Sequence, residues 1–183
     1  KERKFPFDLT MLNKITKNGV EPKSLNMIMG GTGVFKTGTM CHFTTAYLQQ
    51  GLNVLYITLE MSEEKIAERI DANMLNTSLD DLANLPKDVY RKRVDKAQAK
   101  TIGKLIIKEY PTASASTTHF RMLLNELYLK KNFKPDIIMI DYINVCTSSR
   151  IKPSSSVNSY TYIKSIAEEV RGLAVEYNVA IWS

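Results

Sequence analysis

Five short apolar runs, separated by longer segments, constrain the fold of this 183-residue chain most strongly. Most of the runs are continuously apolar rather than alternating, which is typical of strands buried on both faces of a parallel sheet. The segments between them repeat apolar residues at helical spacing. This alternation predicts an α/β fold in which a mostly parallel, doubly wound sheet is flanked by helices. The expected strands span residues 25–29, 54–59, 105–110, 137–140 and 179–182.

Helix boundaries can be predicted at several positions. We expect a helix over residues 37–50 that ends at Gly51, and another that begins after Ser62 as its N-cap. Apolar stripes within residues 120–127 and 160–174 predict two further core-facing helices. No linker or internal repeat divides the chain, so we predict a single domain over residues 1–183. The chain stops at Ser183, inside or just after a strand, and we therefore expect the domain to continue on the C-terminal side.

Composition narrows the protein class only slightly. The chain is 44% hydrophobic and 24% charged, as in ordinary soluble proteins, and no apolar stretch reaches the roughly 18–20 residues of a membrane span. We expect a cytoplasmic protein without membrane contact. The net charge of +6 mildly favours phosphate-rich partners, although the basic run over residues 87–100 is best interpreted as a solvated helix face. Cys41 and Cys146 have no CxxC partner and are expected to be buried, unreactive thiols.

A glycine-rich stretch, GGTGVFKT, lies between the first predicted strand and the first long predicted helix. It follows the GxxxxGK[ST] phosphate-loop pattern at every defined position except one. In such loops the backbone amides surround the phosphates, the lysine reaches the outer phosphates and the hydroxyl binds magnesium. The candidate nucleotide-binding residues are Gly30, Gly31, Thr32, Gly33, Val34, Phe35, Lys36 and Thr37, and Thr37 is also a candidate magnesium ligand.

The exception is Phe35, which occupies the position of the last glycine in the pattern. A side chain there can crowd the phosphates or force a strained backbone. Gly31 and Gly33 still allow tight turns, and the amide of Phe35 remains. We predict that the loop binds a nucleotide. The alternative is a glycine-rich turn in which Lys36 is simply solvated.

Two carboxylates follow predicted strands. Asp141 comes directly after the apolar run at residues 137–140, and Glu60 follows the run at residues 54–59. Because the carboxyl ends of parallel strands meet at one edge of a sheet, both side chains are expected beside the glycine-rich loop. Asp141 would then orient magnesium, and Glu60 would polarise the water that attacks the outermost phosphate. The alternative for Glu60 is an ordinary acidic residue at the start of a helix.

Other chemically notable residues receive structural interpretations. His42 and His119 have no neighbours typical of a catalytic triad or a metal site, so we expect both to be incidental to function. Tyr142 is expected to pack in the core, with stacking near a base as the alternative, and Trp182 is expected to be a core strand residue. The serine-rich stretch at residues 146–159 is predicted to be a mobile surface loop.

Three stretches together resemble the ATPase domain of DnaB-type replicative helicases. They are the glycine-rich loop at residues 30–37, the segment NVLYITLEMSEEKIAERI at residues 53–70, and IIMIDY at residues 137–142. The stretches RIDANML, SLDDL, LLNELYLKKNFKPDII and NSYTYIKSIAEEVRGLAVE are most similar to those of T-even-like bacteriophage helicases. The resemblance extends over nearly the whole chain from about Phe5.

The resemblance implies a RecA-like P-loop NTPase core that uses ATP and Mg²⁺ and assembles into a hexameric ring on single-stranded DNA. Lys36 and Thr37 match the family residues that bind nucleotide and magnesium, Glu60 matches the catalytic glutamate, and Asp141 matches the Walker B aspartate. The DNA-facing loop of the family falls near residues 148–156, where Arg150 and Lys152 are candidates for phosphate contacts. Primase and a helicase loader are further expected partners, and the host cytoplasm is the expected location.

Two departures from the family pattern keep alternatives open. Phe35 replaces the family glycine, and the chain ends before the segment in which the family places a sensor glutamine and an arginine finger. We therefore expect this segment alone to hydrolyse ATP poorly. A RecA-type recombinase or a regulatory ATPase would use the same core. A third hypothesis is a non-catalytic assembly module in which Phe35 closes the nucleotide site.

Overall fold

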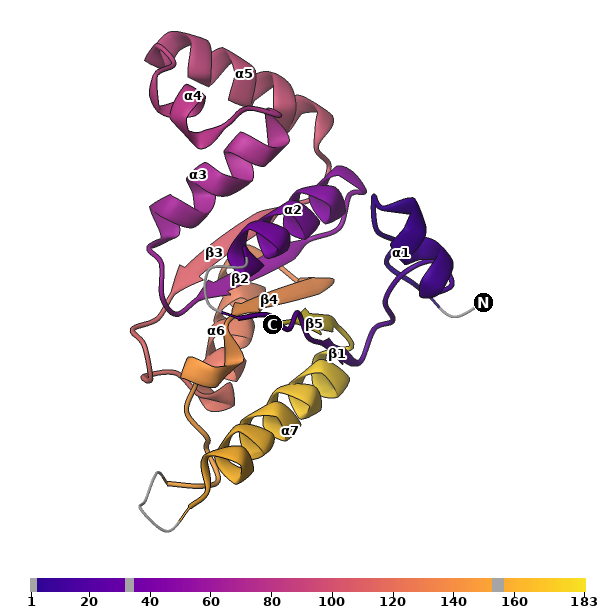
Figure 1. The fold of residues 1–183 in the computed structure, drawn as a ribbon, viewed down its shortest axis with the longest axis vertical. Helices are drawn as coiled ribbons and strands as arrows, with labels where there is room; N and C mark the ends of the chain where they lie inside the picture. The colour runs from indigo at the N-terminus through magenta and orange to yellow at the C-terminus, as the bar shows by residue number, and fades with distance from the viewer. Residues whose placement is uncertain (1–2, 32–34, 153–156) are drawn as a thin grey trace.

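Five parallel strands form the centre of the computed structural model, which describes residues 3–31, 35–152 and 157–183 (Figure 1). The sheet order is β1-β5-β4-β2-β3, and every neighbouring pair is parallel. The doubly wound α/β fold predicted from the sequence is confirmed. The strands are β1 (Ser24–Asn26), β2 (Val54–Thr58), β3 (Leu105–Glu109), β4 (Ile137–Asp141) and β5 (Ala180–Trp182).

Helices connect the strands at nearly the predicted positions. Ser62 caps the third helix, because its side chain accepts a hydrogen bond from the backbone N–H of Lys65, and Gly51 follows the second helix with φ of +84°. Both predicted boundaries are confirmed. The helices are α1 (Thr10–Ile15), α2 (Lys36–Gln49), α3 (Glu63–Met74), α4 (Leu79–Ala83), α5 (Lys87–Lys100), α6 (Thr117–Lys131) and α7 (Ser159–Tyr177), and η1 (Ile143–Val145) is a short 3₁₀ helix.

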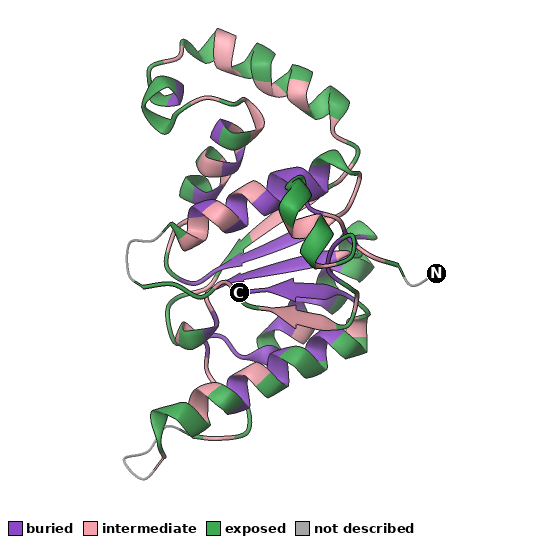
Figure 2. Ribbon diagram, turned by 45° about the vertical axis from the view of Figure 1, so that its right-hand side comes forward, coloured by how far each residue is buried: buried purple, intermediate pink, exposed green. Residues whose placement is uncertain are grey.

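Two hydrophobic cores cover the two faces of the sheet. On one face, α2 and α3 pack against alternate residues of β2 and β4, and Phe5 and Phe7 complete this core. On the other face, α6 and α7 pack against the remaining residues of the same strands. Figure 2 shows that burial is concentrated in the central strands. The edge strands β1 and β3 are only partly buried, because each has a neighbour on one side only.

The connections after β2 and β4 leave in opposite directions. The chain passes from β2 to α3 on one face, and from β4 through η1 to α7 on the other face. Because these strands are neighbours, their carboxyl ends border the topological switch point at which ligands bind in open α/β sheets. The fold therefore points to this edge as the place to look for chemistry.

The structure tests only part of the surface loop predicted at residues 146–159. Cys146 is only 4% exposed, because η1 and the segment after it pack against α7, and residues 153–156 lie outside the described residues. Both cysteines are buried, and burial raises the pKa of the Cys41 thiol to about 11 and that of Cys146 to about 12, so they remain protonated. α5 has no buried residue, as expected for a solvated basic helix. Within the described ranges, every helix is too short or too polar to cross a bilayer.

Candidate functional site

The ends of β2 and β4 lie side by side. Thr58 is the register partner of Asp141, and the backbone N–H of Leu59 donates to the backbone carbonyl of Asp141 at 3.0 Å. The buried hydroxyl of Thr58 closes a tight turn by donating to the carbonyl of Met61 at 2.8 Å and accepting from its N–H at 3.2 Å. This turn leaves Glu60 exposed at the end of β2, beside the end of β4.

Tyr56 orients the carboxylate of Asp141. Asp141 is only 4% exposed, and its Oδ2 accepts a hydrogen bond of 2.9 Å from the hydroxyl of Tyr56 on the neighbouring strand. Burial raises the pKa of Tyr56 far above its ordinary value, so the hydroxyl remains a donor at every physiological pH. A fixed hydrogen bond of this kind sets the direction of the remaining carboxylate oxygen, as supporting residues do at metal sites.

Tyr142 contacts one of the three predicted catalytic residues and directly follows another. The Lys36 ammonium lies over the Tyr142 ring, 4.7 Å from its centroid. Burial and then the negative charge of Glu60 raise the pKa of Tyr142. Tyr142 follows Asp141 in the chain, and both line the same cavity as Lys36. The prediction that Tyr142 packs in the core is wrong, because the chain leaves the sheet directly after Asp141 and Tyr142 is only half-buried.

A cavity of about 390 Å³ lies at this edge of the sheet. Its walls come from the chain after β1, the first turns of α2 and the segment after β4. Gly30, Lys36, Asp141 and Tyr142 are among its lining residues. The cavity therefore contains the beginning of the glycine-rich loop, its lysine and the strand-end aspartate in one place.

The start of α2 suits an anion. Among the described residues, no side chain caps this helix and its first turn contains no acidic residue. The first backbone N–H groups of a helix and its dipole attract negative charge, and here they face the same edge as Lys36. These residues fit a magnesium-bound triphosphate: the amides and Lys36 would hold phosphate oxygens, and Asp141 and Thr37 would supply oxygen ligands to the metal.

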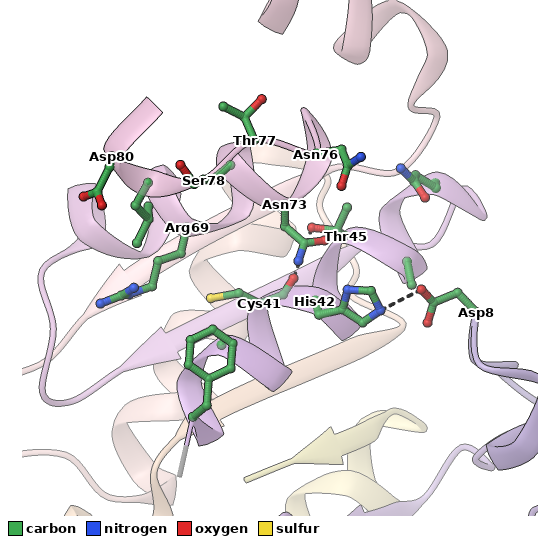
Figure 3. A pocket seen from close by; sticks show the side chains of 16 residues that line it. Asp8, Cys41, His42, Thr45, Arg69, Asn73, Asn76, Thr77, Ser78 and Asp80 are labelled. Atoms are coloured by element: carbon green, nitrogen blue, oxygen red, sulfur yellow. Dashed lines mark hydrogen bonds and ion pairs between the residues drawn. The ribbon is translucent and has the colours of Figure 1, made fainter. Parts of the chain in front are cut away.

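Phe35 adopts the left-handed conformation, with φ of 65° and ψ of 31°. This conformation suits glycine and costs other residues roughly 1–2 kcal/mol. The ring is 72% exposed and folds back over Gly38, where an added Cβ would collide with it. Phe35 lines a second cavity of about 780 Å³ between α2 and the α3–α4 region, on which Arg69 and His42 also border (Figure 3). The side chain thus points away from the cavity that contains Lys36.

The contact between Phe35 and Gly38 predicts a measurable coupling. In a Phe35→Gly background, Gly38→Ala should stabilise the protein by about 1 kcal/mol, because alanine favours a helix interior over glycine. In the unmodified protein the new methyl group must displace the ring, so the gain should shrink by about 0.5–1.5 kcal/mol. Urea unfolding of the four proteins measures this coupling. Equal effects of Gly38→Ala on the free energy of unfolding in both backgrounds would contradict the observed contact between the Phe35 ring and Gly38.

Not every predicted residue reaches the cavity. Thr32, Gly33 and Val34 lie outside the described residues. Glu60, Gly31 and Thr37 are not among the residues that line the cavity, and Thr37 is half-buried in the first turn of α2. Arg150 and Lys152 are exposed on the segment after η1, which leads away from the sheet toward the N-terminal end of α7 (Figure 1). They form a region separate from the nucleotide cavity.

The histidines have structural contacts. His42 lies 2.7 Å from the carboxylate of Asp8 (Figure 3), and the Nδ1 atom of His119 accepts from the backbone N–H of Ser116 at the start of α6. Within the described part of the chain, no cluster of three or more acidic, histidine or cysteine side chains suits a metal ion.

Two residues at the site escaped the sequence analysis. Tyr56 interrupts the apolar run at residues 54–59, and a polar group within such a run, on the strand beside Asp141, is a signal that could have been used. Ser183 gave no such signal. Its Oγ accepts from the backbone N–H of Ile143 at 2.8 Å, and its carbonyl accepts from Ile28 at 2.8 Å. Ser183 thus joins the segment after Asp141 to the approach to the glycine-rich loop.

Comparisons with known proteins agree with this geometry. The chain is 51% identical over 186 residues to the DnaB-like replicative helicase of Enterobacteria phage T4, covering all of this chain and 39% of that protein. It is 31% identical over 138 residues to a probable plasmid replicative DNA helicase of Chlamydia psittaci, covering 73% of this chain and 28% of the relative. The chain thus spans less than half of the length of these relatives.

Solved structures share the fold at low sequence identity. A structure described as that of a DnaB-like replicative helicase and its interactions with primase has a TM-score of 0.74 at 16% identity, covering 98% of this chain and 42% of that chain. Another solved structure, described as an ATPase domain, has a TM-score of 0.72 at 16% identity, covering 94% of this chain and 60% of that chain. The family model described as the DnaB-like helicase C terminal domain matches residues 5–183. The chain therefore belongs to the DnaB-like helicase C-terminal domain family.

Proposed function

We propose that this chain is the motor domain of a replicative DNA helicase, in which ATP hydrolysis drives movement along single-stranded DNA. The observation that carries the proposal is the cavity at the carboxyl edge of the sheet that Gly30, Lys36 and Asp141 line, with Glu60 exposed after the neighbouring strand β2. Membership of the helicase family supports the same activity. We further propose that the protein works as a hexameric ring in the host cytoplasm and contacts primase and a helicase loader.

The residues of this edge would divide the chemistry between them. Magnesium, held by Thr37 and Asp141, would neutralise charge on the phosphates. Lys36 would hold the outer phosphate, and Tyr56 would keep the carboxylate of Asp141 in place. Glu60 would orient and polarise the attacking water, because it lies after the end of β2, beside the end of β4 that carries Asp141. Arg150 and Lys152 would contact DNA phosphates.

The placement of Phe35 argues for an open nucleotide site over a closed assembly module. Its side chain borders the larger cavity and folds over Gly38, so the Lys36 side of the loop is not occupied by the ring. The same core would serve a recombinase or a regulatory ATPase. Only the products of the reaction distinguish those functions from a helicase.

The test uses the full-length protein with a forked DNA duplex and with single-stranded DNA, each with and without ATP and magnesium. We expect ATP to strengthen single-strand binding, DNA to stimulate hydrolysis, and the fork to be unwound. Binding should weaken steeply as salt increases. Strand exchange without unwinding would identify a recombinase. ATP binding that appears only after Phe35→Gly would support the closed module, and indifference to both ATP and DNA would refute the motor.

A further inference from the structure

A row of polar side chains on α7 binds the backbone that follows η1. Tyr162, Ser165 and Glu169 are spaced by three and four residues, so they lie on one face of the helix. Apolar residues of the same helix, including Ile166 and Val170, belong to the hydrophobic core. The polar row therefore interrupts a face that otherwise serves packing.

Each member of the row bonds the same short segment. The hydroxyl of Tyr162 accepts from the backbone N–H of Ser148 at 3.1 Å, and Ser165 Oγ lies 3.2 Å from Ser148 Oγ. Glu169 Oε1 accepts from the backbone N–H of Ser149 at 2.9 Å. Ser148 Oγ also accepts from the N–H groups of Arg150 and Ile151, at 3.1 and 3.0 Å. The backbone that presents the Arg150 side chain is thus fixed from Ser148 onward.

Glu169 is an unexpected residue for a purely structural contact. It is 4% exposed, and among the described residues its Oε2 has no hydrogen-bond partner. Burial of a carboxylate that is only partly hydrogen-bonded opposes folding, whereas an apolar side chain at this position would not. A role in placing the segment explains its presence better than a contribution to stability.

We infer that Glu169 is a positioning residue for single-stranded DNA, holding the Ser148–Ser149 backbone so that Arg150 and Lys152 face the strand. The inference rests on the proposed function. Arg150 and Lys152 are exposed, and within the described part of the chain they form no ion pair, so their charges are free for phosphate. Glu169 itself does not touch the DNA.

Charge and position predict opposite results for Glu169→Ala. Removing a negative charge near a DNA-binding segment should strengthen binding to a polyanion. Loss of the anchor should instead weaken it, on the order of tenfold, and should lower the slope of log affinity against log salt by about 1.4 if both phosphate contacts are lost. Glu168→Ala is the matched control, because Glu168 is exposed on the same helix and carries the same charge.

The experiment measures binding of a fluorescent oligothymidylate to full-length protein over a salt series, together with ATP affinity. We expect Glu169→Ala to show weaker binding and a smaller salt slope at unchanged ATP affinity, and Glu168→Ala to show neither loss. Glu169→Gln retains an acceptor oxygen for the N–H of Ser149 and should restore the slope. A Glu169→Ala protein that behaves like Glu168→Ala would overturn the inference.

Two further variants separate a failure of the inference from a failure to fold or to bind DNA. If the melting temperature shows that Glu169→Ala does not fold, Tyr162→Phe removes one acceptor of the same segment, and an unchanged salt slope in that variant would overturn the inference. The double variant Arg150→Ala, Lys152→Ala should show the same decrease in the slope of log affinity against log salt as Glu169→Ala. If unmodified protein ignores single-stranded DNA, the proposed function fails. If it binds and the double variant keeps the full slope, the inference alone fails.

Discussion

Replacing Glu60 by glutamine is expected to lower the kcat of DNA-stimulated ATP hydrolysis by about 10²- to 10⁴-fold, the range for loss of a general base. Glutamine has the shape of glutamate, but it cannot take a proton from water. ATP affinity should therefore stay within about threefold of the unmodified value, because Glu60 acts on the attacking water and not on the phosphates.

Steady-state kinetics of full-length protein, with nucleotide binding measured by calorimetry, checks this expectation. Glu64→Gln is the matched control, since Glu64 is exposed in the first turn of α3 and makes the same change of charge. A kcat of Glu60→Gln equal to that of the control would mean that Glu60 is an ordinary acidic residue near the start of a helix, with no catalytic role. A large loss of ATP affinity would show instead that Glu60 shapes the binding cavity.

Replacing Lys36 by alanine should weaken ATP binding by about 10- to 150-fold. A hydrogen bond to a charged group contributes about 1.5–3 kcal/mol to the free energy of binding. Each factor of ten in affinity corresponds to about 1.4 kcal/mol, which gives the expected range. The folded structure should tolerate the change. The ammonium contacts the Tyr142 ring, and a partly exposed contact of this kind contributes about 0.5–1 kcal/mol.

Calorimetric titration with ATP and magnesium measures the effect, and thermal unfolding in the absence of nucleotide confirms that the variant is folded. Lys65→Ala provides the control, because Lys65 is an exposed lysine on α3. Unchanged ATP affinity in Lys36→Ala would mean that the glycine-rich stretch is only a turn. It would also remove the basis for assigning a catalytic role to Glu60.

The fold could be predicted from the sequence where burial is two-sided. Residues 54–59 and 137–140 are mostly or wholly apolar because helices cover both faces of β2 and β4, and this pattern is visible without coordinates. β1 was harder to predict. It is an edge strand of three residues that ends at Asn26, whereas the sequence predicted a strand over residues 25–29. Edge strands have fewer neighbours to impose a sequence pattern.

The candidate site was predictable in part for a related reason. Motif spacing indicated Lys36 and Thr37, because the chemistry restricts residue type at fixed positions along the chain. Glu60 and Asp141 were indicated by their places directly after predicted strands. The roles of Tyr142 and Ser183 depend on contacts between segments far apart in sequence, such as the hydrogen bond from Ile143 to Ser183. Such contacts leave no local pattern, so only the fold reveals them.

The anchoring of the segment after η1 illustrates the same limit. Its serines and its proline are typical of a mobile loop, yet Ser148 and Ser149 are bound by α7. The partners Tyr162 and Glu169 follow more than ten residues later, within a helix whose apolar stripe dominates the sequence pattern. Hydrogen bonds across a tertiary contact therefore hold the first residues of this stretch, whereas residues 153–156 lie outside the described residues.

The central position of β2 and β4 has a consequence for how a motor of this kind can change shape. The parallel ladder between the two strands ends at Thr58 and Asp141, and helices pack both strands from both faces, so the backbone of Asp141 is held rigidly. Glu60 lies beyond the ladder, in the connection from β2 to α3. A shift of that connection would therefore move Glu60 relative to a stationary Asp141 and could change the reactive geometry without disturbing the sheet.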